Sequence, residues 1–139
     1  MSSTTTNSDK PAVLVIDDSD IDRETMVSIL KDAGFNVHSQ PSPIGATKLA
    51  RDLGVRVVVI DQNLPAMDGS KLASLFRSNP VLRSVRLILV SGFDEASMAE
   101  LAKKAQADAF IGKSVIHTQL APAVRRLSVA AAAATPSSK

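Results

Sequence analysis

The stretch Val55-Arg56-Val57-Val58-Val59-Ile60-Asp61 decides the fold of this chain. A short apolar run rich in β-branched residues is typical of a strand that is buried on both faces. The run ends in Asp61, and residues 62–69 (Gln-Asn-Leu-Pro-Ala-Met-Asp-Gly) predict a loop that leads into a helix. A second apolar run, 12–16, ends in the same way, in Asp17 and Asp18. Two such strands in one sheet would bring three carboxylates to one edge, which is unfavourable unless a cation or a chemical task is present.

Strand and helix signals alternate five times along the chain. We expect strands at 12–16, 35–38, 55–60, 87–90 and 109–111. We expect five helices. The first spans about 20–33, the second runs from the cap Ser42-Pro43 to about 53, and the third runs from 68 to about 79. The fourth follows the cap Asp94, and the fifth follows Lys113. The inward stripes of the first and third helices are predicted to be Ile21, Met26, Ile29 and Leu30, and Leu72, Leu75 and Phe76. Short apolar strands that alternate with helices indicate a parallel sheet covered on both faces, with its site outside the carboxyl ends of the strands.

The length and composition suit one domain. The chain has 139 residues, of which 45% are hydrophobic, and we expect that domain at 11–128. Residues 1–10 are predicted to be a disordered tail, and 129–139 an alanine-rich helix extension that frays near Pro136. No apolar stretch is long enough to span a membrane and no signal peptide is present, so we expect a cytoplasmic protein without membrane partners.

The residue types exclude several kinds of site. Cysteine is absent and there are only two histidines, which argues against disulfides, a thiol nucleophile and a zinc site. Residues 1–69 carry 6 Lys/Arg and 10 Asp/Glu, whereas residues 70–139 carry 10 and 4. The basic residues are scattered, and Trp and Tyr are absent, so we expect no nucleic-acid partner.

Polar residues follow four of the expected strands, at the edge where a site would lie. They are Asp17 and Asp18, Asp61, Ser91 and Lys113. Each alone has an ordinary alternative: a helix cap, a turn residue or an exposed lysine. Together they suit phosphoryl transfer, because carboxylates are hard ligands for Mg²⁺, and an ammonium and a hydroxyl can hold phosphate oxygens. An aspartate can then act as the nucleophile and form an acyl phosphate.

These residues resemble a known family. The residues that carry the resemblance are Asp17-Asp18, Asp61 with Leu64-Pro65-Ala66-Met67-Asp68-Gly69, Ser91 and Lys113. Through them, the chain resembles the CheY-like receiver domain of two-component response regulators over about residues 11–128. The resemblance implies an α/β fold with a doubly wound, flavodoxin-like, five-stranded parallel sheet in the order 2-1-3-4-5 and helices on both faces.

The resemblance also implies a role for each matching residue. Asp61 would accept the phosphoryl group. Mg²⁺ (or Mn²⁺) would be bound by Asp18, Asp61 and the backbone carbonyl of Asn63, with Asp17 acting through water. Ser91 and Lys113 would bind the phosphoryl group, and Phe110 would be the aromatic switch, although ordinary core packing explains Phe110 equally well. Such a domain is a phosphoprotein that catalyses its own phosphorylation and dephosphorylation rather than a conventional enzyme.

The implied partners are other signalling proteins. A sensor histidine kinase or histidine phosphotransfer protein would supply the phosphoryl group, and an output protein would bind the face made by the fourth helix, the strand 109–111 and the last helix. Because the chain ends after one domain, we expect a stand-alone module that signals by contact or by phosphorelay. Two alternatives stay open: a phosphorylation-independent interaction module, and a hydrolase with an aspartyl-phosphate intermediate. Asn63 argues against the hydrolase, because such enzymes carry an acid at that position.

The sequence departs from the family pattern at three positions. Ser114 follows Lys113 where the family usually has proline, and a cis bond there is disfavoured because a non-proline one costs about 2.5–4 kcal/mol. Phe110 lacks the hydroxyl of the usual tyrosine. Phe93 lies two residues after Ser91, and we predict that its ring hinders attacking water and slows loss of the phosphoryl group.

Overall fold

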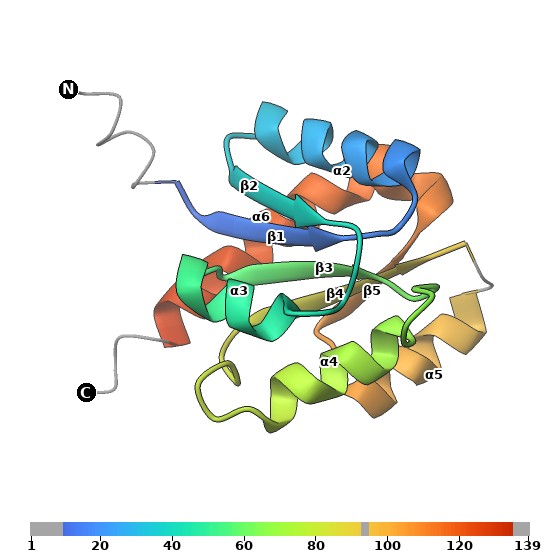
Figure 1. Cartoon of the computed structure of the whole chain (residues 1–139). Helices are drawn as coiled ribbons and strands as arrows, with labels where there is room; N and C mark the ends of the chain where they lie inside the picture. The colour runs from blue at the N-terminus through green and yellow to red at the C-terminus, as the bar shows by residue number, and fades with distance from the viewer. Residues whose placement is uncertain (1–9, 93–94, 135–139) are drawn as a thin grey trace.

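The computed structural model describes residues 10–92 and 95–134, and places their strands and helices in strict alternation (Figure 1). The strands are β1 (Ala12–Ile16), β2 (Asn36–Gln40), β3 (Val57–Asp61), β4 (Arg86–Ser91) and β5 (Ala109–Gly112). The helices are α2 (Asp20–Asp32), α3 (Ala46–Leu53), α4 (Gly69–Ser78), α5 (Glu95–Ala105) and α6 (Ile116–Ala134), the last preceded by a short 3₁₀ turn, η1 (Lys113–Val115).

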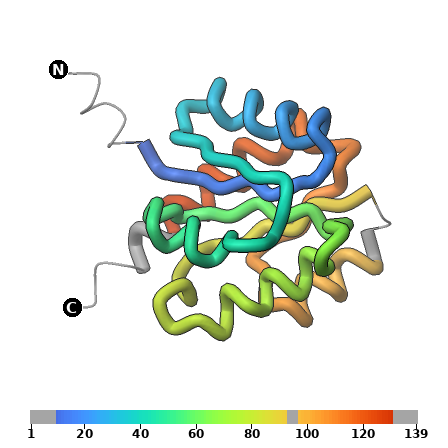
Figure 2. The backbone as a smooth tube through the Cα atoms, in the orientation of Figure 1, coloured from blue at the N-terminus to red at the C-terminus, as the bar shows by residue number. Residues whose placement is uncertain are grey.

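The five strands form one parallel sheet in the order β2-β1-β3-β4-β5, which confirms the predicted fold. Although β2 and α3 separate them in sequence, β1 and β3 run side by side (Figure 2). Their register pairs Ile16 with Ile60, so the residues that follow these two strands emerge at the same edge.

Helices cover both faces of the sheet because alternate strand residues point to opposite sides. On one face, Val57 and Val59 of β3 belong to the core cluster that includes residues of α2 and α6. On the other face, Val58 and Ile60 belong to the cluster that includes residues of α3, α4 and α5. Burial on both faces explains why β3 is a continuous apolar run rather than an alternating one.

Two residues predicted to face the core do not. Ile21 is 77% exposed and Leu75 is 44% exposed. The buried stripe of α2 contains Met26 and Leu30, four residues apart, and Ile21 is turned about 140° away from Met26 around the helix axis. In α4 the stripe likewise follows a four-residue spacing, and Leu75 lies at its margin.

The start of α3 was also predicted wrongly. The helix begins at Ala46, and its N-cap is Gly45, at φ 76°, rather than Ser42. The Ser42 hydroxyl instead accepts a hydrogen bond from the Ile44 backbone N–H, which closes a turn before the helix. The side chain of Gln40 donates to the backbone carbonyls of Ser42 and Ile44 and holds the same turn.

Other predicted bounds differ by one or two residues, as at β2 and β3. The predicted cap Asp94 and the predicted phosphate-access residue Phe93 lie outside the described residues, as do 1–9 and 135–139 of the two predicted tails. The peptide bond between Lys113 and Ser114 is trans.

Candidate functional site

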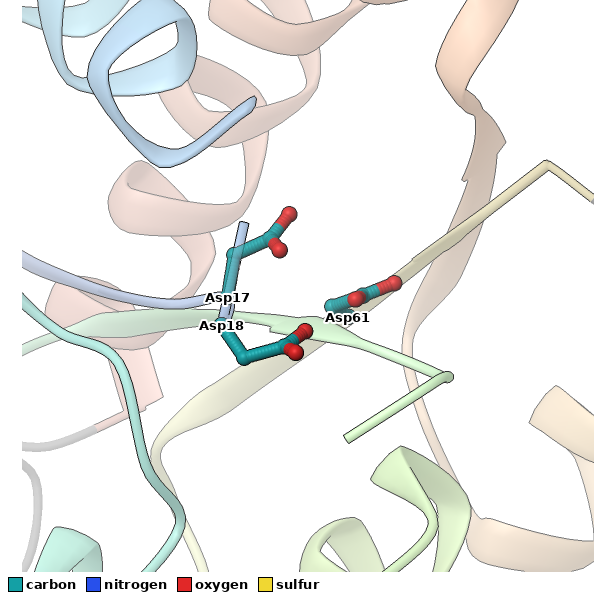
Figure 3. A group of neighbouring side chains, drawn as sticks. All are labelled: Asp17, Asp18 and Asp61. Carbon is teal, nitrogen blue, oxygen red and sulfur yellow. The ribbon is translucent and has the colours of Figure 1, made fainter. Parts of the chain in front are cut away.

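Three aspartates gather where β1 and β3 end (Figure 3). One carboxylate oxygen from each of Asp17, Asp18 and Asp61 lies within 4.8 Å of the others. Asp17 and Asp61 are buried, whereas Asp18 is exposed and leaves the group open to solvent. The parallel register produces this meeting, because it brings the ends of two strands that are distant in sequence to one edge of the sheet.

Asp17 is held by the start of α2. Its Oδ1 accepts a hydrogen bond from the Ser19 backbone N–H at 2.9 Å, and its backbone carbonyl accepts one from Arg23 Nη1 at 2.8 Å. Ser19 in turn caps the helix, because its hydroxyl accepts from the Asp22 backbone N–H. The other carboxylate oxygen of Asp17, Oδ2, is buried and lies 3.1 Å from Lys113 Nζ.

Asp61 is positioned by the end of β3 and the loop that follows. The backbone N–H of Gln62 donates to the Val90 carbonyl, which extends the pairing of β3 with β4 past Asp61. Gln62 is buried, and its backbone carbonyl and side-chain oxygen accept from the N–H groups of Gly69 and Ser70. The sequence analysis missed this role of Gln62, whose signal is a polar residue directly after an apolar strand.

Lys113 supplies the positively charged side chain of the site. Gly112 pairs with Ser91 in the β4–β5 register, so Lys113 emerges at the same edge as the acids. Its Nζ lies 2.7 Å from Asp22 Oδ2, 3.1 Å from Asp17 Oδ2 and 3.5 Å from Asp61 Oδ1. Ser114 in place of proline therefore does not prevent Lys113 from reaching the acids.

Asp22 is a further acid at this edge, and it is not among the site residues predicted from the sequence. Its signal in the sequence is its place in the first turn of the helix after β1, at the edge where the strands end. Only the folded chain places it beside a lysine 91 positions away.

The negative charge of the clustered carboxylates exceeds the positive charge of Lys113. The pKa of Asp61 is raised to about 6, first by burial and then by the neighbouring charge of Asp17. Lys113 and a hydrogen bond from the Asn63 backbone oppose this rise without cancelling it. Burial by itself lowers the pKa of Lys113, but its hydrogen bonds to Asp22 and Asp17 outweigh burial and raise the pKa above its ordinary value. The site therefore favours binding of additional positive charge.

The residues at the site fit a hard divalent cation. Three carboxylate oxygens converge at this edge, and hard divalent cations such as Mg²⁺ prefer oxygen ligands of this kind. The exposed Asp18 leaves a side open on which a small ion and its waters can enter. Asn63, whose backbone donates to Asp61, lies beside the same carboxylate.

The other predicted site residues lie on the two strands beyond β3. Ser91 is the last residue of β4 and is buried, one position past the residue that pairs with Asp61. Phe110 lies on the edge strand β5, where it is partly buried against the core cluster shared with α3, α4 and α5. It also lines a groove together with Thr118, Pro122 and Arg126 of α6.

The fold and this acidic edge together define a class of protein. The response regulator receiver domain family matches residues 13–125, and the chain belongs to that family. Receiver domains accept a phosphoryl group in two-component signalling and interact with histidine kinases and output proteins.

Individual relatives are more distant. The chain is 34% identical to a cyclic di-GMP phosphodiesterase of Thermotoga maritima over 74% of its length, and 31% identical to the sensor kinase CckA of Brucella abortus over 83%. It spans only 27% and 12% of those two proteins. A putative response regulator from Chloroflexus aurantiacus has the same fold, with a TM-score of 0.81 over 86% of this chain and 98% of that one, at 21% identity.

Within the described residues, no helix combines the length and the apolar character needed to cross a membrane.

Proposed function

We propose that Asp61 is the residue that accepts the phosphoryl group, from a sensor histidine kinase or a histidine phosphotransfer protein. The observation that carries this proposal is the convergence of three carboxylates beside Lys113. Asp61 is the last residue of β3, the middle strand of the sheet, and it is buried with Lys113 Nζ 3.5 Å from its Oδ1.

Asp18, Asp61 and the backbone carbonyl of Asn63 are the proposed ligands of Mg²⁺, with Asp17 acting through a bound water. When bound, Mg²⁺ offsets the repulsion among the carboxylates and neutralises charge on the incoming phosphoryl group. Lys113 and the Ser91 hydroxyl are placed at the same edge and would hold the other phosphoryl oxygens.

We also propose that phosphorylation changes partner binding on the face made by α5, β5 and α6. Phe110 would be the switch, because it lies on β5 in the groove that it shares with Arg126. Lys103 and Lys104 of α5 and Arg126 of α6 are exposed and can contact a partner, although Lys104 lines a groove with residues of α4. Arg125 is less suited to that role, because it stacks over Phe35 and donates to the Ala33 carbonyl.

Incubation with Mg²⁺ and acetyl phosphate tests the proposal. Intact mass should show one added phosphoryl group in the wild type and none in Asp61→Asn, with Asp68→Asn as an exposed acidic control that still accepts it. Intact mass is the suitable readout, because the chain has no Trp or Tyr whose fluorescence would report the change. A wild type that stays unmodified would favour the phosphorylation-independent interaction module.

A further inference from the structure

Lys113 is shared among three carboxylates, and the nearest is not one of the three clustered acids. Its Nζ lies 2.7 Å from Asp22 Oδ2, which is the length of a strong charge-assisted hydrogen bond. Its distance of 3.5 Å to Asp61 Oδ1 is longer than such a bond. Its distance to Asp17 Oδ2 is 3.1 Å, so in the unmodified protein Asp22 and Asp17 hold the ammonium, on the α2 side of the site.

Asp22 is well fixed for this contact. It lies in the first turn of α2, and its backbone N–H donates to the hydroxyl of the capping residue Ser19. Ser19 also donates through its backbone to Asp17, so the helix start and the acidic cluster form one hydrogen-bonded unit. Movement of Lys113 toward Asp61 thus breaks a bond to an anchored partner.

We propose that Asp22 is a positioning residue, which withholds Lys113 from Asp61 and thereby slows phosphoryl acceptance. This inference rests on the proposed function of Asp61. In the reaction with acetyl phosphate, an Asp61 carboxylate oxygen forms a bond to phosphorus. The bond from phosphorus to the bridging oxygen breaks, and acetate leaves with that electron pair. Lys113 keeps its protons throughout and moves from Asp22 to the phosphoryl oxygens.

The effect is modest because Asp22 is partly exposed, with 39% of its side chain accessible to solvent. Ion pairs that are open to solvent are weak, so we expect removal of this one to speed phosphorylation by about two- to fivefold. Damage to the fold would slow the reaction instead, which makes a faster rate specific to the proposed role.

The test compares Asp22→Asn and Asp22→Ala with Asp20→Asn. Asp20 lies in the same helical turn and pairs with Arg23, so the control removes the same charge from the same region without removing the partner of Lys113. The rate is followed by intact mass with Mg²⁺ and acetyl phosphate. We expect both Asp22 variants to react faster than the wild type and Asp20→Asn to match it. Asp22 variants that match Asp20→Asn, or react more slowly, overturn the inference.

Crystal structures of Asp22→Asn and Asp20→Asn without a phosphoryl donor give a readout that does not depend on phosphorylation. We expect Lys113 Nζ within hydrogen-bond distance of Asp61 only in Asp22→Asn. An unmoved Lys113 overturns the inference even if the wild type is phosphorylated. A wild type that accepts no phosphoryl group contradicts the proposed function of Asp61, while these structures still decide whether Asp22 withholds Lys113.

Discussion

The backbone of Gly69 lies against the peptide that joins Asp61 to Gln62. A Cβ at Gly69 would lie 2.9 Å from the carbonyl carbon of Asp61 and 2.8 Å from the Cα of Gln62, and would press on the Asp61 carbonyl oxygen. The Gly69 N–H also donates to the Gln62 carbonyl at 3.0 Å. The start of α4 therefore helps to set the position of Asp61, and it requires a residue without a side chain.

Gly69→Ala should lower the free energy of unfolding by about 1–3 kcal/mol, because the added methyl group meets backbone that cannot rotate away. It should also slow phosphorylation of Asp61. Urea denaturation followed by far-UV circular dichroism measures the first effect. Gly92→Ala is the control, because a Cβ there meets no atom within 4 Å, and its stability should stay within about 0.5 kcal/mol of the wild type. Equal effects of the two substitutions would contradict the close packing at Gly69.

Asp61→Asn should stabilise the metal-free protein at neutral pH. The folded-state pKa of Asp61, about 6, lies above that of an exposed aspartate, about 3.9, so the folded protein binds the proton more tightly. The contribution of the protonated form is fully present below about pH 4 and is lost as the pH rises through about 6. At pH 7 we expect Asp61→Asn to be more stable than the wild type by about 1–3 kcal/mol.

The pH dependence of this stability difference distinguishes a raised pKa of Asp61 from a stabilisation that is the same at every pH. The gap between Asp61→Asn and the wild type should nearly close at about pH 4, in urea denaturation with a chelator present. Asp68→Asn, which removes an exposed carboxylate, is the control for the loss of an acidic charge. A gap that stays constant between about pH 4 and pH 7 would contradict the raised pKa of Asp61.

Asp18→Asn should weaken Mg²⁺ binding by about tenfold or more, which corresponds to about 1.4 kcal/mol, because it removes a charged oxygen from the cluster. Titration calorimetry or NMR shifts measure the affinity. Asp20→Asn should bind Mg²⁺ as the wild type does, because the carboxylate of Asp20 pairs with Arg23. In the wild type, Mg²⁺ should raise the unfolding temperature, since it binds the folded state. Equal affinities of the two variants would argue that Asp18 is no ligand.

Gln106→Gly should stabilise the protein by about 0.5–1 kcal/mol, because a left-handed backbone disfavours a side chain but not glycine. Gln106 follows α5 in that region, at φ 61°. Its carbonyl accepts from Arg77 Nε, and this bond is unaffected by the substitution. Gln106→Ala keeps the strained conformation and should not give the gain. Thermal unfolding of the two variants, compared with the wild type, checks the difference.

Local patterns in the chain predict much of the fold and part of the site. The β-branched run before Asp61 predicts a buried strand, and the alternation of such runs with helical segments predicts a parallel sheet. Since parallel strands end at one edge, the pattern alone is enough to place Asp17, Asp18 and Asp61 together. The confirmed strand order followed from the resemblance to receiver domains.

Other details of the fold could not be predicted from these patterns. Ser42 and Pro43 carry a helix-cap pattern, but the side chain of Gln40 supports a turn there and α3 begins later. Ile21 fits an apolar stripe in sequence, but α2 packs through Met26 and Leu30, and Ile21 lies about 140° from Met26 around the helix axis.

The sequence alone predicts which polar groups meet at the site: acids, a hydroxyl and a lysine at the ends of apolar strands. Only the tertiary structure decided how the lysine is shared, because Asp22 and Lys113 are 91 positions apart and meet where α2 begins beside the end of β5. The physical reason is that an apolar pattern specifies which face of an element is buried, whereas the partner of a charged side chain depends on the register and packing of elements distant in the chain.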